Sequence, residues 1–540
     1  MLDRRDLLKL GAVGGAAALI QGCAERSPDA VEFESPVSAA GRDFELEEWT
    51  VAELQAAMEE GRLSSRDIVT RYRERIEAID HAGPELRSVL TVNPDADRIA
   101  AALDEERASG ELRGPLHGIP VLLKDNIDTA DSMATTAGSL ALAGTIALED
   151  SGVARKLREA GAVILGKANL SEWANFRSER SSSGWSGVGG QTKNPYALDR
   201  NPCGSSSGSG AAVSANLCAL AVGTETDGSV VCPSNASGVV GVKPTVGRVS
   251  RAGIVPISES QDTAGPMART VRDAALLLTA MSGIDSRDPA TAASPGPFDA
   301  SDGLDEGALQ GARIGVWRER FGFHEKVDTV LEEGLAALRD AGAELVDPVE
   351  MPSVREAGKH EWEVLLYEFK DGLAKYLATR GDDTSIRALA DAIAFNEANR
   401  DREMPYFEQE IFVKSEAKGP LSEAEYKKAR AECIRLTRTE GIDRVVAEHR
   451  LDAIVAPTGG PAWMTDLVNG DHFGGGSSRA AAVSGYPNVT VPAGLIFGLP
   501  VGMSFFGPAW TEARLLGLAY AFEQATMVRR PPRFLETAEL

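Results

Sequence analysis

A series of short apolar segments, spaced along the chain from Gly114 onward, most constrains the fold. They read GIPVLLKDNI, AVILGKAN, LCALAVG, ARIGVW, AELVDP, DAIVAPT, NVTVPAG and VGMSFFG, and amphipathic helical segments lie among several of them. Short, almost wholly apolar strands of this kind are typical of a sheet that helices cover on both faces. The pattern therefore predicts an α/β fold with a largely buried sheet, and no internal repeat is visible.

Length and composition are sufficient for one large domain. The chain has 540 residues, of which 43% are hydrophobic, a length compatible with two domains or with one large α/β domain that carries insertions. We expect a single domain over residues 43–530. Within it, residues 353–449 are charged and helical in pattern, which predicts a helical insertion that roofs a cleft. Near the domain's start, SSRDIVTRYRERIEAID follows a Ser64/Ser65 cap, and its apolar spacing predicts a helix whose core face is Ile68, Tyr72, Ile76 and Ile79.

The N-terminus has the features of an export signal. Residues 1–22 contain a pair of arginines and then a small-residue apolar run from Leu10 to Ile20, and Cys23 follows Ile-Gln-Gly. This pattern resembles a twin-arginine signal joined to a lipoprotein cleavage box, and the run is too short to span a bilayer. We expect acylation of Cys23, a tether over residues 23–42 and a periplasmic or cell-envelope lipoprotein. The alternative is a simple soluble secretory signal.

Composition excludes several kinds of partner. The formal charge is −24, and Lys and Arg form no cluster that would follow a phosphate backbone; we therefore expect no nucleic-acid partner. The six histidines contain no H-x-x-H or H-E-x-x-H pair, so we expect no metal and no cofactor. The chain is expected to be a monomer or a homodimer that contacts the membrane only through its lipid anchor.

The cysteines after the tether match no disulfide or zinc spacing. Cys203, Cys218, Cys232 and Cys433 lie in apolar or Gly/Ser-rich surroundings, and we expect buried free thiols, although an oxidising compartment permits a bridge.

Two segments each present a serine at a turn. Residues 204–208, Gly-Ser-Ser-Ser-Gly, formally satisfy the nucleophile-elbow pattern G-x-S-x-G, but the loop YALDRNPC precedes them instead of the required strand. Standing alone, they would be interpreted as a helix-entry loop with serine caps. In TETDGS, however, Ser229 follows an apolar strand, and it lies 24 residues after Ser205 (229 − 205). A helix and a strand between them can return Ser229 to the serine loop.

Lys124 is the candidate base for these serines. A serine hydroxyl attacks an amide only when a base removes its proton, and no histidine lies near either motif. Leu122, Leu123 and Ile127 predict that Lys124 is buried. A lysine there is either a snorkelling structural residue or a base whose pKa is lowered by desolvation. Asp125 would oppose that lowering, but strand alternation directs it to the opposite face.

These segments, with GPLHGIPVLLKDNIDT, GAVILGKANLSEWA and SQDTAGPMART, resemble the amidase signature family from about Phe44 to Thr526. The resemblance implies a twisted mixed β-sheet between helical layers. It also implies a nucleophilic serine, a bridging serine that follows a cis peptide, and a lysine, which fall by position on Ser229, Ser205 and Lys124.

The neighbours of these residues have expected roles as well. The turn Thr226, Asp227, Gly228 and Ser229 can direct consecutive backbone N–H groups at one point and form an oxyanion hole. Gly204 and Ser206 are expected to support the bridging serine. Candidate substrate-binding residues, of a kind that more often has only a structural role, are Asn175, Asn194, Tyr367, Trp463 and Phe473.

Departures from the common family pattern bear on the substrate. Cys203 and Ser207 occupy glycine positions, so Ser205 is assigned by spacing. Val231 stands where relatives acting on carboxylate-bearing substrates have an arginine, which weakens that substrate class. The strings NPCGSSSGS, GTETDGSVVCPS and SQDTAGPMAR are most similar to bacterial peptide amidases, which release ammonia from C-terminally amidated peptides. The alternatives are a broad aliphatic, aryl or fatty-acid amidase and a non-catalytic binding lipoprotein that keeps the fold.

Overall fold

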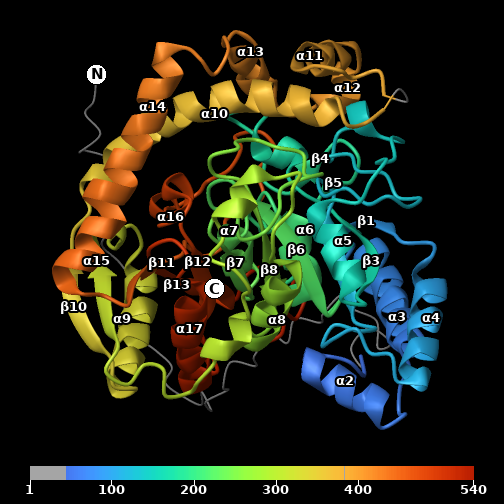
Figure 1. Cartoon of the computed structure of the whole chain (residues 1–540), viewed down its shortest axis with the longest axis horizontal. Helices are drawn as coiled ribbons and strands as arrows, with labels where there is room; N and C mark the ends of the chain where they lie inside the picture. Colours follow the sequence, from blue (N-terminus) through green and yellow to red (C-terminus); the bar gives the residue numbers. More distant parts are fainter. Residues whose placement is uncertain (1–43, 382–383) are drawn as a thin grey trace, which may run out of the picture. The chain divides into compact units, whose positions relative to one another are not determined.

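The computed structural model describes residues 44–381 and 384–540 (Figure 1). The predicted export signal, Cys23 and the tether over residues 23–42 lie outside the described residues. None of the helices in the described ranges is long and apolar enough to cross a membrane.

A mixed sheet of eleven strands runs through the described ranges in the order β1-β3-β2-β6-β8-β7-β12-β13-β11-β9-β10 (Figure 1). Strand β2 pairs in parallel with β3 and β6, whereas β8, β7, β12 and β13 pair antiparallel with their neighbours. The strands are β1 Val89–Val92, β2 Pro120–Lys124, β3 Val163–Ala168, β6 Leu220–Glu225, β7 Val240–Lys243, β8 Thr263–Ala268, β9 Arg313–Trp317, β10 Glu344–Val349, β11 Ala453–Pro457, β12 Asn488–Ile496 and β13 Leu499–Phe506; a separate hairpin pairs β4 Trp185–Ser186 with β5 Gly190–Gln191.

Helices flank this sheet, and the predicted α/β class with a mixed sheet is confirmed (Figure 1). Outside the insertion they are α2 Val51–Glu59, α3 Ser65–Arg75, α4 Ala96–Ser109, α5 Gly152–Glu159, α6 Ser207–Ser214, α7 Val231–Ala236, α8 Val271–Met281, α9 Glu325–Asp340, α16 Arg479–Ser484 and α17 Glu512–Thr526.

Local sequence signals set the boundaries of the first helices. Helix α3 begins after Ser64, whose side chain accepts from Asp67 N at 3.0 Å while Asp67 Oδ2 accepts from Ser64 N at 2.9 Å. This reciprocal capping box satisfies two N–H groups that the first turn would leave unpaired. The predicted core face is confirmed, since Ile68, Tyr72, Ile76 and Ile79 are all fully buried.

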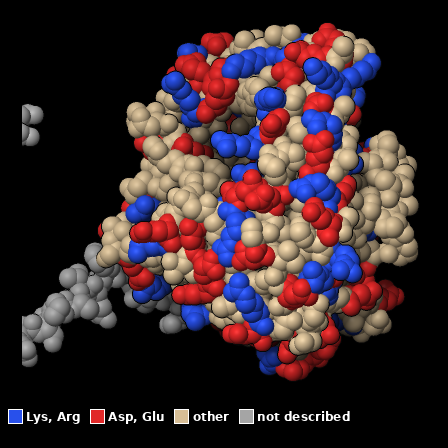
Figure 2. All heavy atoms as spheres, turned by 90° about the vertical axis from the view of Figure 1, so that its left-hand side faces the viewer, with Lys and Arg blue, Asp and Glu red and all other residues tan. Residues whose placement is uncertain are grey.

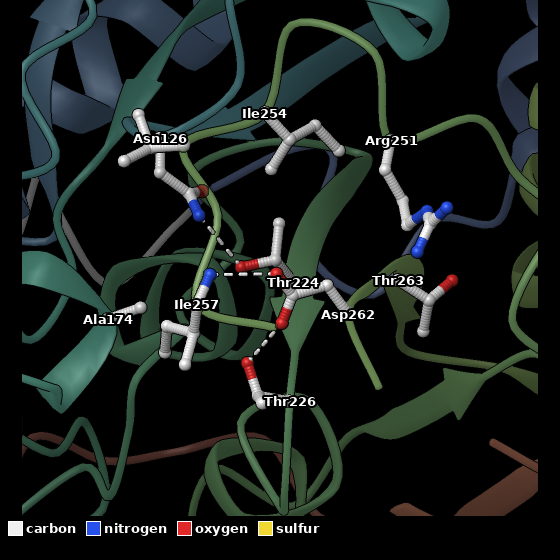
Figure 3. Close-up of a pocket in the computed structure, with 10 residues that line it drawn as sticks. Asn126, Ala174, Thr224, Thr226, Arg251, Ile254, Ile257, Asp262 and Thr263 are labelled. Carbon is white, nitrogen blue, oxygen red and sulfur yellow. Dashed lines mark hydrogen bonds between the residues drawn. The ribbon is translucent and has the colours of Figure 1, made fainter. Parts of the chain in front are cut away.

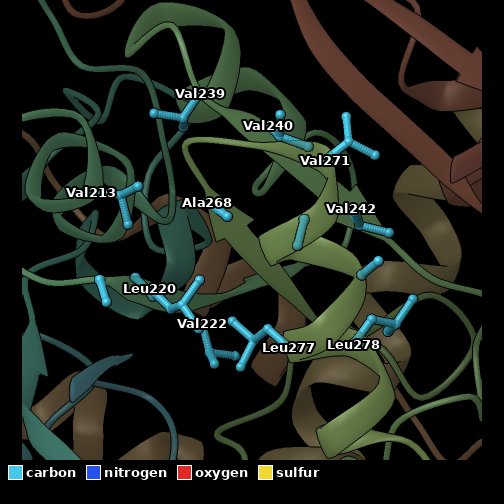
Figure 4. Packing of buried hydrophobic residues seen from close by; sticks show 14 of the residues in the cluster. Val213, Leu220, Val222, Val239, Val240, Val242, Ala268, Val271, Leu277 and Leu278 are labelled. Carbon is cyan, nitrogen blue, oxygen red and sulfur yellow. The ribbon is translucent and has the colours of Figure 1, made fainter. Parts of the chain in front are cut away.

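The core lies between the sheet and the helices that cover it. Figure 4 shows part of this packing: Leu277 and Leu278 of α8 lie with Val222 of β6 and Val242 of β7 in one buried cluster. Each of these side chains is fully buried. Burial of such a side chain stabilises the fold by about 1.5–3 kcal/mol, which fixes β6 and the turn that follows it.

Residues 353–449 are mostly helical and lie along the top and the left-hand side of the view in Figure 1. The long helix α10 contacts α13, α14 and α16, so it joins this layer to the rest of the domain. The helices of this segment are α10 Ser353–Leu377, α11 Leu389–Ala398, α12 Arg400–Glu403, α13 Glu410–Glu416, α14 Ala424–Ile434 and α15 Asp443–His449.

The prediction of free thiols is wrong for two cysteines. Cys203, in the loop before α6, and Cys232, in α7, form a disulfide with Cα atoms 5.9 Å apart. Cys218 and Cys433 are free and buried, as expected. The bridge has no recognisable spacing because the two cysteines meet only when α6 and α7, which contact each other, are packed together. It ties the segment that holds Ser205 to the helix that follows Ser229.

Candidate active site

Lys124 is the last residue of β2 and is fully buried. Its ammonium group makes three hydrogen bonds: Nζ donates to Ser205 Oγ at 2.7 Å, to Thr224 Oγ1 at 2.9 Å and to the Thr224 carbonyl oxygen at 3.2 Å. Because β2 and β6 are adjacent parallel strands, the end of one strand meets Thr224 near the end of the other. The lysine is therefore held in a single position against Ser205.

Burial lowers the pKa of Lys124 toward neutral pH. Desolvation lowers the pKa of Lys124 to about 7, and the charges of Asp262 and Glu225 oppose this shift. The charge of Asp125 does not contribute to the pKa of Lys124. The Asp125 carboxylate accepts from Thr136 N at 3.2 Å, and its charge acts on Lys167. The predicted strand alternation therefore separates Asp125 from Lys124. Lys124 does not snorkel, since it is fully buried; its role as a base stays a prediction.

Ser205 follows a cis peptide bond from Gly204 and is fully buried. The neighbouring Ser206 connects the serine loop to both other parts of the site. Its hydroxyl donates to the Thr224 carbonyl oxygen at 3.0 Å, and its backbone N–H donates to the Ser229 carbonyl oxygen at 3.1 Å. The structure thus brings Ser205, Ser229 and Lys124 into one cluster.

The turn that carries Ser229 lies between β6 and α7. Gly228 has φ +85°, a left-handed conformation that glycine adopts without strain, and a Cβ there would lie 3.2 Å from Ser478 Oγ. The Glu225 carboxylate accepts from Val230 N at 2.8 Å and Val231 N at 3.0 Å. These contacts fix both ends of the turn.

The turn leaves its own donors available. Across residues 44–381 and 384–540, the backbone N–H groups of residues 226–229 donate to no acceptor, and Ser229 Oγ makes no hydrogen bond. Ser229 is 8% exposed, whereas Lys124 and Ser205 are 0% exposed, so the Ser229 side of the cluster is the one that faces solvent. Hydrogen bonds between reacting groups often tighten only when substrate binds.

Three residues around Lys124 were not identified from the sequence: Thr224, Asn126 and Asp262. Figure 3 shows them around a cavity of about 10 Å³, with Asn126 Nδ2 donating to Thr224 Oγ1 at 3.0 Å and Thr226 Oγ1 donating to Asp262 at 2.6 Å. Burial raises the pKa of Asp262 to about 6. The strings TETDGS and SQDTAG contain two of them, but no local pattern indicates that they meet at Lys124.

Two of the predicted substrate-binding residues lie near the disulfide. Trp463 packs against the apolar cluster that contains Cys203 and Cys232. Its ring lies 5.9 Å, edge-on, from that of Phe473, which is 52% exposed. Both belong to the loop between β11 and α16, which ends beside the Ser229 turn at Ser478.

The structure gives the other three candidates structural contacts. Tyr367 is not brought to the cluster: its hydroxyl lies 2.6 Å from Glu423 Oε2, inside the helical layer. Asn194 is fully buried and donates to the Ala236 carbonyl oxygen at 2.8 Å. Asn175 Oδ1 accepts from Ser181 Oγ at 2.7 Å. Helix α10, which carries Tyr367, packs against α14, and a role of Tyr367 in substrate binding stays a prediction.

The charges on the face of the molecule shown in Figure 2 are mixed. In Figure 2, acidic and basic side chains are interspersed over the face shown, and a hollow with basic side chains at its edge opens below the helical layer at the top. Across the described ranges, no group of His, Cys, Asp and Glu is arranged to hold a metal ion.

Comparison with known proteins gives consistent results. The family model described as Amidase matches residues 67–516. A native peptide amidase from Stenotrophomonas maltophilia is 52% identical, with a TM-score of 0.87 over 91% of this chain and 99% of that one. A peptide amidase in complex with the competitive inhibitor chymostatin is 53% identical, with a TM-score of 0.88 over 91% and 100% of the two chains. A probable amidase of Arabidopsis thaliana is 42% identical over 91% of this chain and 93% of its own length.

Proposed function

Because this chain belongs to the amidase family and is a hydrolase of linear amides, we propose that it removes ammonia from C-terminal peptide amides by means of Ser229, Ser205 and Lys124. The observation that supports this chemistry most directly is the 2.7 Å hydrogen bond between Lys124 Nζ and Ser205 Oγ, with both groups fully buried. A lysine held dry against a hydroxyl can take a proton from it near neutral pH.

In the first half of the reaction, Ser229 Oγ attacks the amide carbon. Its proton passes to Ser205 Oγ while Ser205 gives its own proton to neutral Lys124. The N–H groups of residues 226–229, which lack acceptors among the described residues, stabilise the oxygen that becomes negatively charged. Loss of a single such donor typically costs about 10²- to 10³-fold in rate.

The C–N bond then breaks, and the proton held by Lys124 returns through Ser205 to the leaving nitrogen, which departs as ammonia. Water attacks the Ser229 ester next and delivers a proton along the same route to Lys124. Collapse of this second intermediate returns that proton to Ser229 and releases a carboxylic acid. The sum is an amide and water converted to an acid and ammonia, with no cofactor.

The proposal of a peptide-amide substrate is supported by the similarity of this chain to two solved proteins. The two solved proteins described as peptide amidases are 52% and 53% identical and align over 91% of this chain. Trp463 and Phe473 lie on the loop that ends beside the Ser229 turn, where we propose that they contact the peptide. This assignment separates the protein from aryl and fatty-acid amidases.

We also propose that the protein acts outside the cytoplasm as a lipoprotein attached through Cys23. The paired arginines, the apolar run and the Ile-Gln-Gly-Cys sequence support export. The disulfide between Cys203 and Cys232 agrees with this location, because disulfides persist in oxidising compartments and are rare in the cytosol.

The test is ammonia release from a C-terminally amidated dipeptide. We expect release by the native protein, loss of release in Ser229→Ala, and normal release in the matched control Ser109→Ala, which alters an exposed serine at the end of α4. If the native protein hydrolyses an aryl or fatty-acid amide but no peptide amide, the substrate proposal is wrong. If Ser229→Ala remains fully active, the proposed nucleophile is wrong.

A further inference from the structure

A carboxylate stands in the turn that is proposed to stabilise an oxyanion. Asp227 lies two residues before Ser229, and a negative charge there opposes the negative charge that develops on the substrate oxygen. Its side chain is 22% exposed, so solvent screens it only in part. A turn of this composition needs a cation close to Asp227 to carry out the proposed function.

Arg479 is that cation. At the first position of α16, its Nε lies 3.9 Å from Asp227 Oδ2, and the preceding residue, Ser478, donates from Oγ to Asp227 Oδ1 at 2.5 Å. The charge of Asp227 also acts on Arg320 and Lys243. In the described part of the chain, however, Arg479 is the one cation that forms an ion pair with it within 4.0 Å.

The helical insertion holds Arg479 in place. Glu361 of α10 accepts from Arg479 Nε at 3.0 Å. The guanidinium lies close to α10 at Gly358, because a Cβ added at this glycine would lie 3.3 Å from Arg479 Cζ. Gln261 provides a second connection between Glu361 and the turn. Its Nε2 donates to Glu361 Oε1 at 3.1 Å and to the Thr226 carbonyl oxygen at 3.2 Å. Glu361 therefore reaches both Thr226 and Asp227.

The charge balance directs Arg479 toward Asp227. Burial, and then the charge of Asp227, raise the pKa of Glu361, which favours its protonated form. A protonated Glu361 still accepts a hydrogen bond through its carbonyl oxygen but does not neutralise the guanidinium. The charge of Asp227 makes the largest contribution to raising the pKa of Arg479, which stays cationic.

We propose that Arg479, held by Glu361 of the helical insertion, neutralises Asp227 and so allows the turn of residues 226–229 to stabilise the oxyanion. Arg479 and Glu361 are then positioning residues, since they act through the turn and not on the substrate. The inference rests on the proposed function, and it gives the helical insertion a part in the chemistry.

The experiment compares kcat and KM for ammonia release from an amidated dipeptide in four proteins: native, Arg479→Met, Asp227→Asn and the double variant. We expect Arg479→Met to lower kcat by about tenfold or more with KM changed by less than about threefold, because the loss falls on the transition state. In the Asp227→Asn background the same arginine change should cost less than about threefold, since no carboxylate remains to be neutralised. Arg479→Lys should recover much of the lost kcat.

Three results would overturn the proposal: unchanged kcat in Arg479→Met, a rise in KM alone, or an equal loss from the arginine change in both Asp227 backgrounds. If Arg479→Met does not fold by circular dichroism, Arg479→Gln replaces it, because glutamine can still hydrogen bond to Glu361 without a charge. Failure of the proposed function is distinguished by the native protein, which would then release no ammonia.

Discussion

The pH dependence of ammonia release tests whether burial makes Lys124 the base. A free lysine has a pKa of 10.5, and burial lowers that of Lys124 to about 7. At pH 7 the neutral fraction therefore rises from about 3 in 10,000 to about one half. Because the neutral amine is the active form, activity should increase as the pH rises through about 7 and then level off.

The expected change of kcat/KM with pH can be calculated from this pKa. With a pKa of about 7, kcat/KM at pH 6 should be about fivefold below its value at pH 7, and at pH 5 about fiftyfold below. A base that kept the pKa of free lysine would instead gain about tenfold per pH unit up to pH 10. The assay is ammonia release from an amidated dipeptide between pH 5 and pH 10 at constant ionic strength.

Substitution of a carboxylate near Lys124 should move the midpoint of the pH profile, the pH at which activity is half of its upper limit, in a known direction. The charge of Asp262 raises the pKa of Lys124, so Asp262→Asn should shift the midpoint to lower pH. The matched control is Asp125→Asn, which removes the carboxylate next to Lys124 in sequence that faces Lys167 instead; its midpoint should remain near that of the native protein. A log-linear rise that continues beyond pH 9, or an upward shift in Asp262→Asn, would refute the reasoning.

Three further changes have expected outcomes. Replacement of both Cys203 and Cys232 by alanine should lower the free energy of unfolding by about 3.5 kcal/mol, from the 29-residue separation of the bridge; urea unfolding measures this, and an unchanged midpoint would contradict it. Ser205→Ala should reduce ammonia release by about 10²- to 10⁴-fold, and near-native activity would rule out a proton relay through this hydroxyl. Cys23→Ser should move the exported protein from the membrane fraction to the soluble fraction, as followed by immunoblot; retention in the membrane fraction would disprove the lipid anchor.

Local patterns determined much of the fold. The alternation of apolar strands and helices predicted the α/β class, and the Ser64/Ser65 cap marked the start of α3, because capping and periodicity depend on residues within one turn of each other. The apolar neighbours of Lys124 predicted its burial for the same reason. Gly228 indicated a tight turn before Ser229, and its positive φ agrees.

Contacts between distant segments could not be predicted in this way. The Cys203–Cys232 bridge, the position of Asp262 near Lys124 and the pairing of Arg479 with Asp227 all depend on how separate elements pack. Ser478 and Asp227 hydrogen bond although 251 residues separate them, and no local spacing records such a meeting. Val231 stands where some relatives have an arginine, and the sequence did not indicate that Arg479 of α16 would lie beside the same turn.

The sequence by itself therefore determined which residue types lie at strand ends and turns, since local backbone preferences and burial decide those. Only the tertiary structure decided the partners of each charged group, and with them the pKa of Lys124. The shift in that pKa is the net result of desolvation, which lowers it, and of nearby negative charges, which raise it. Both effects depend on which elements surround the end of β2.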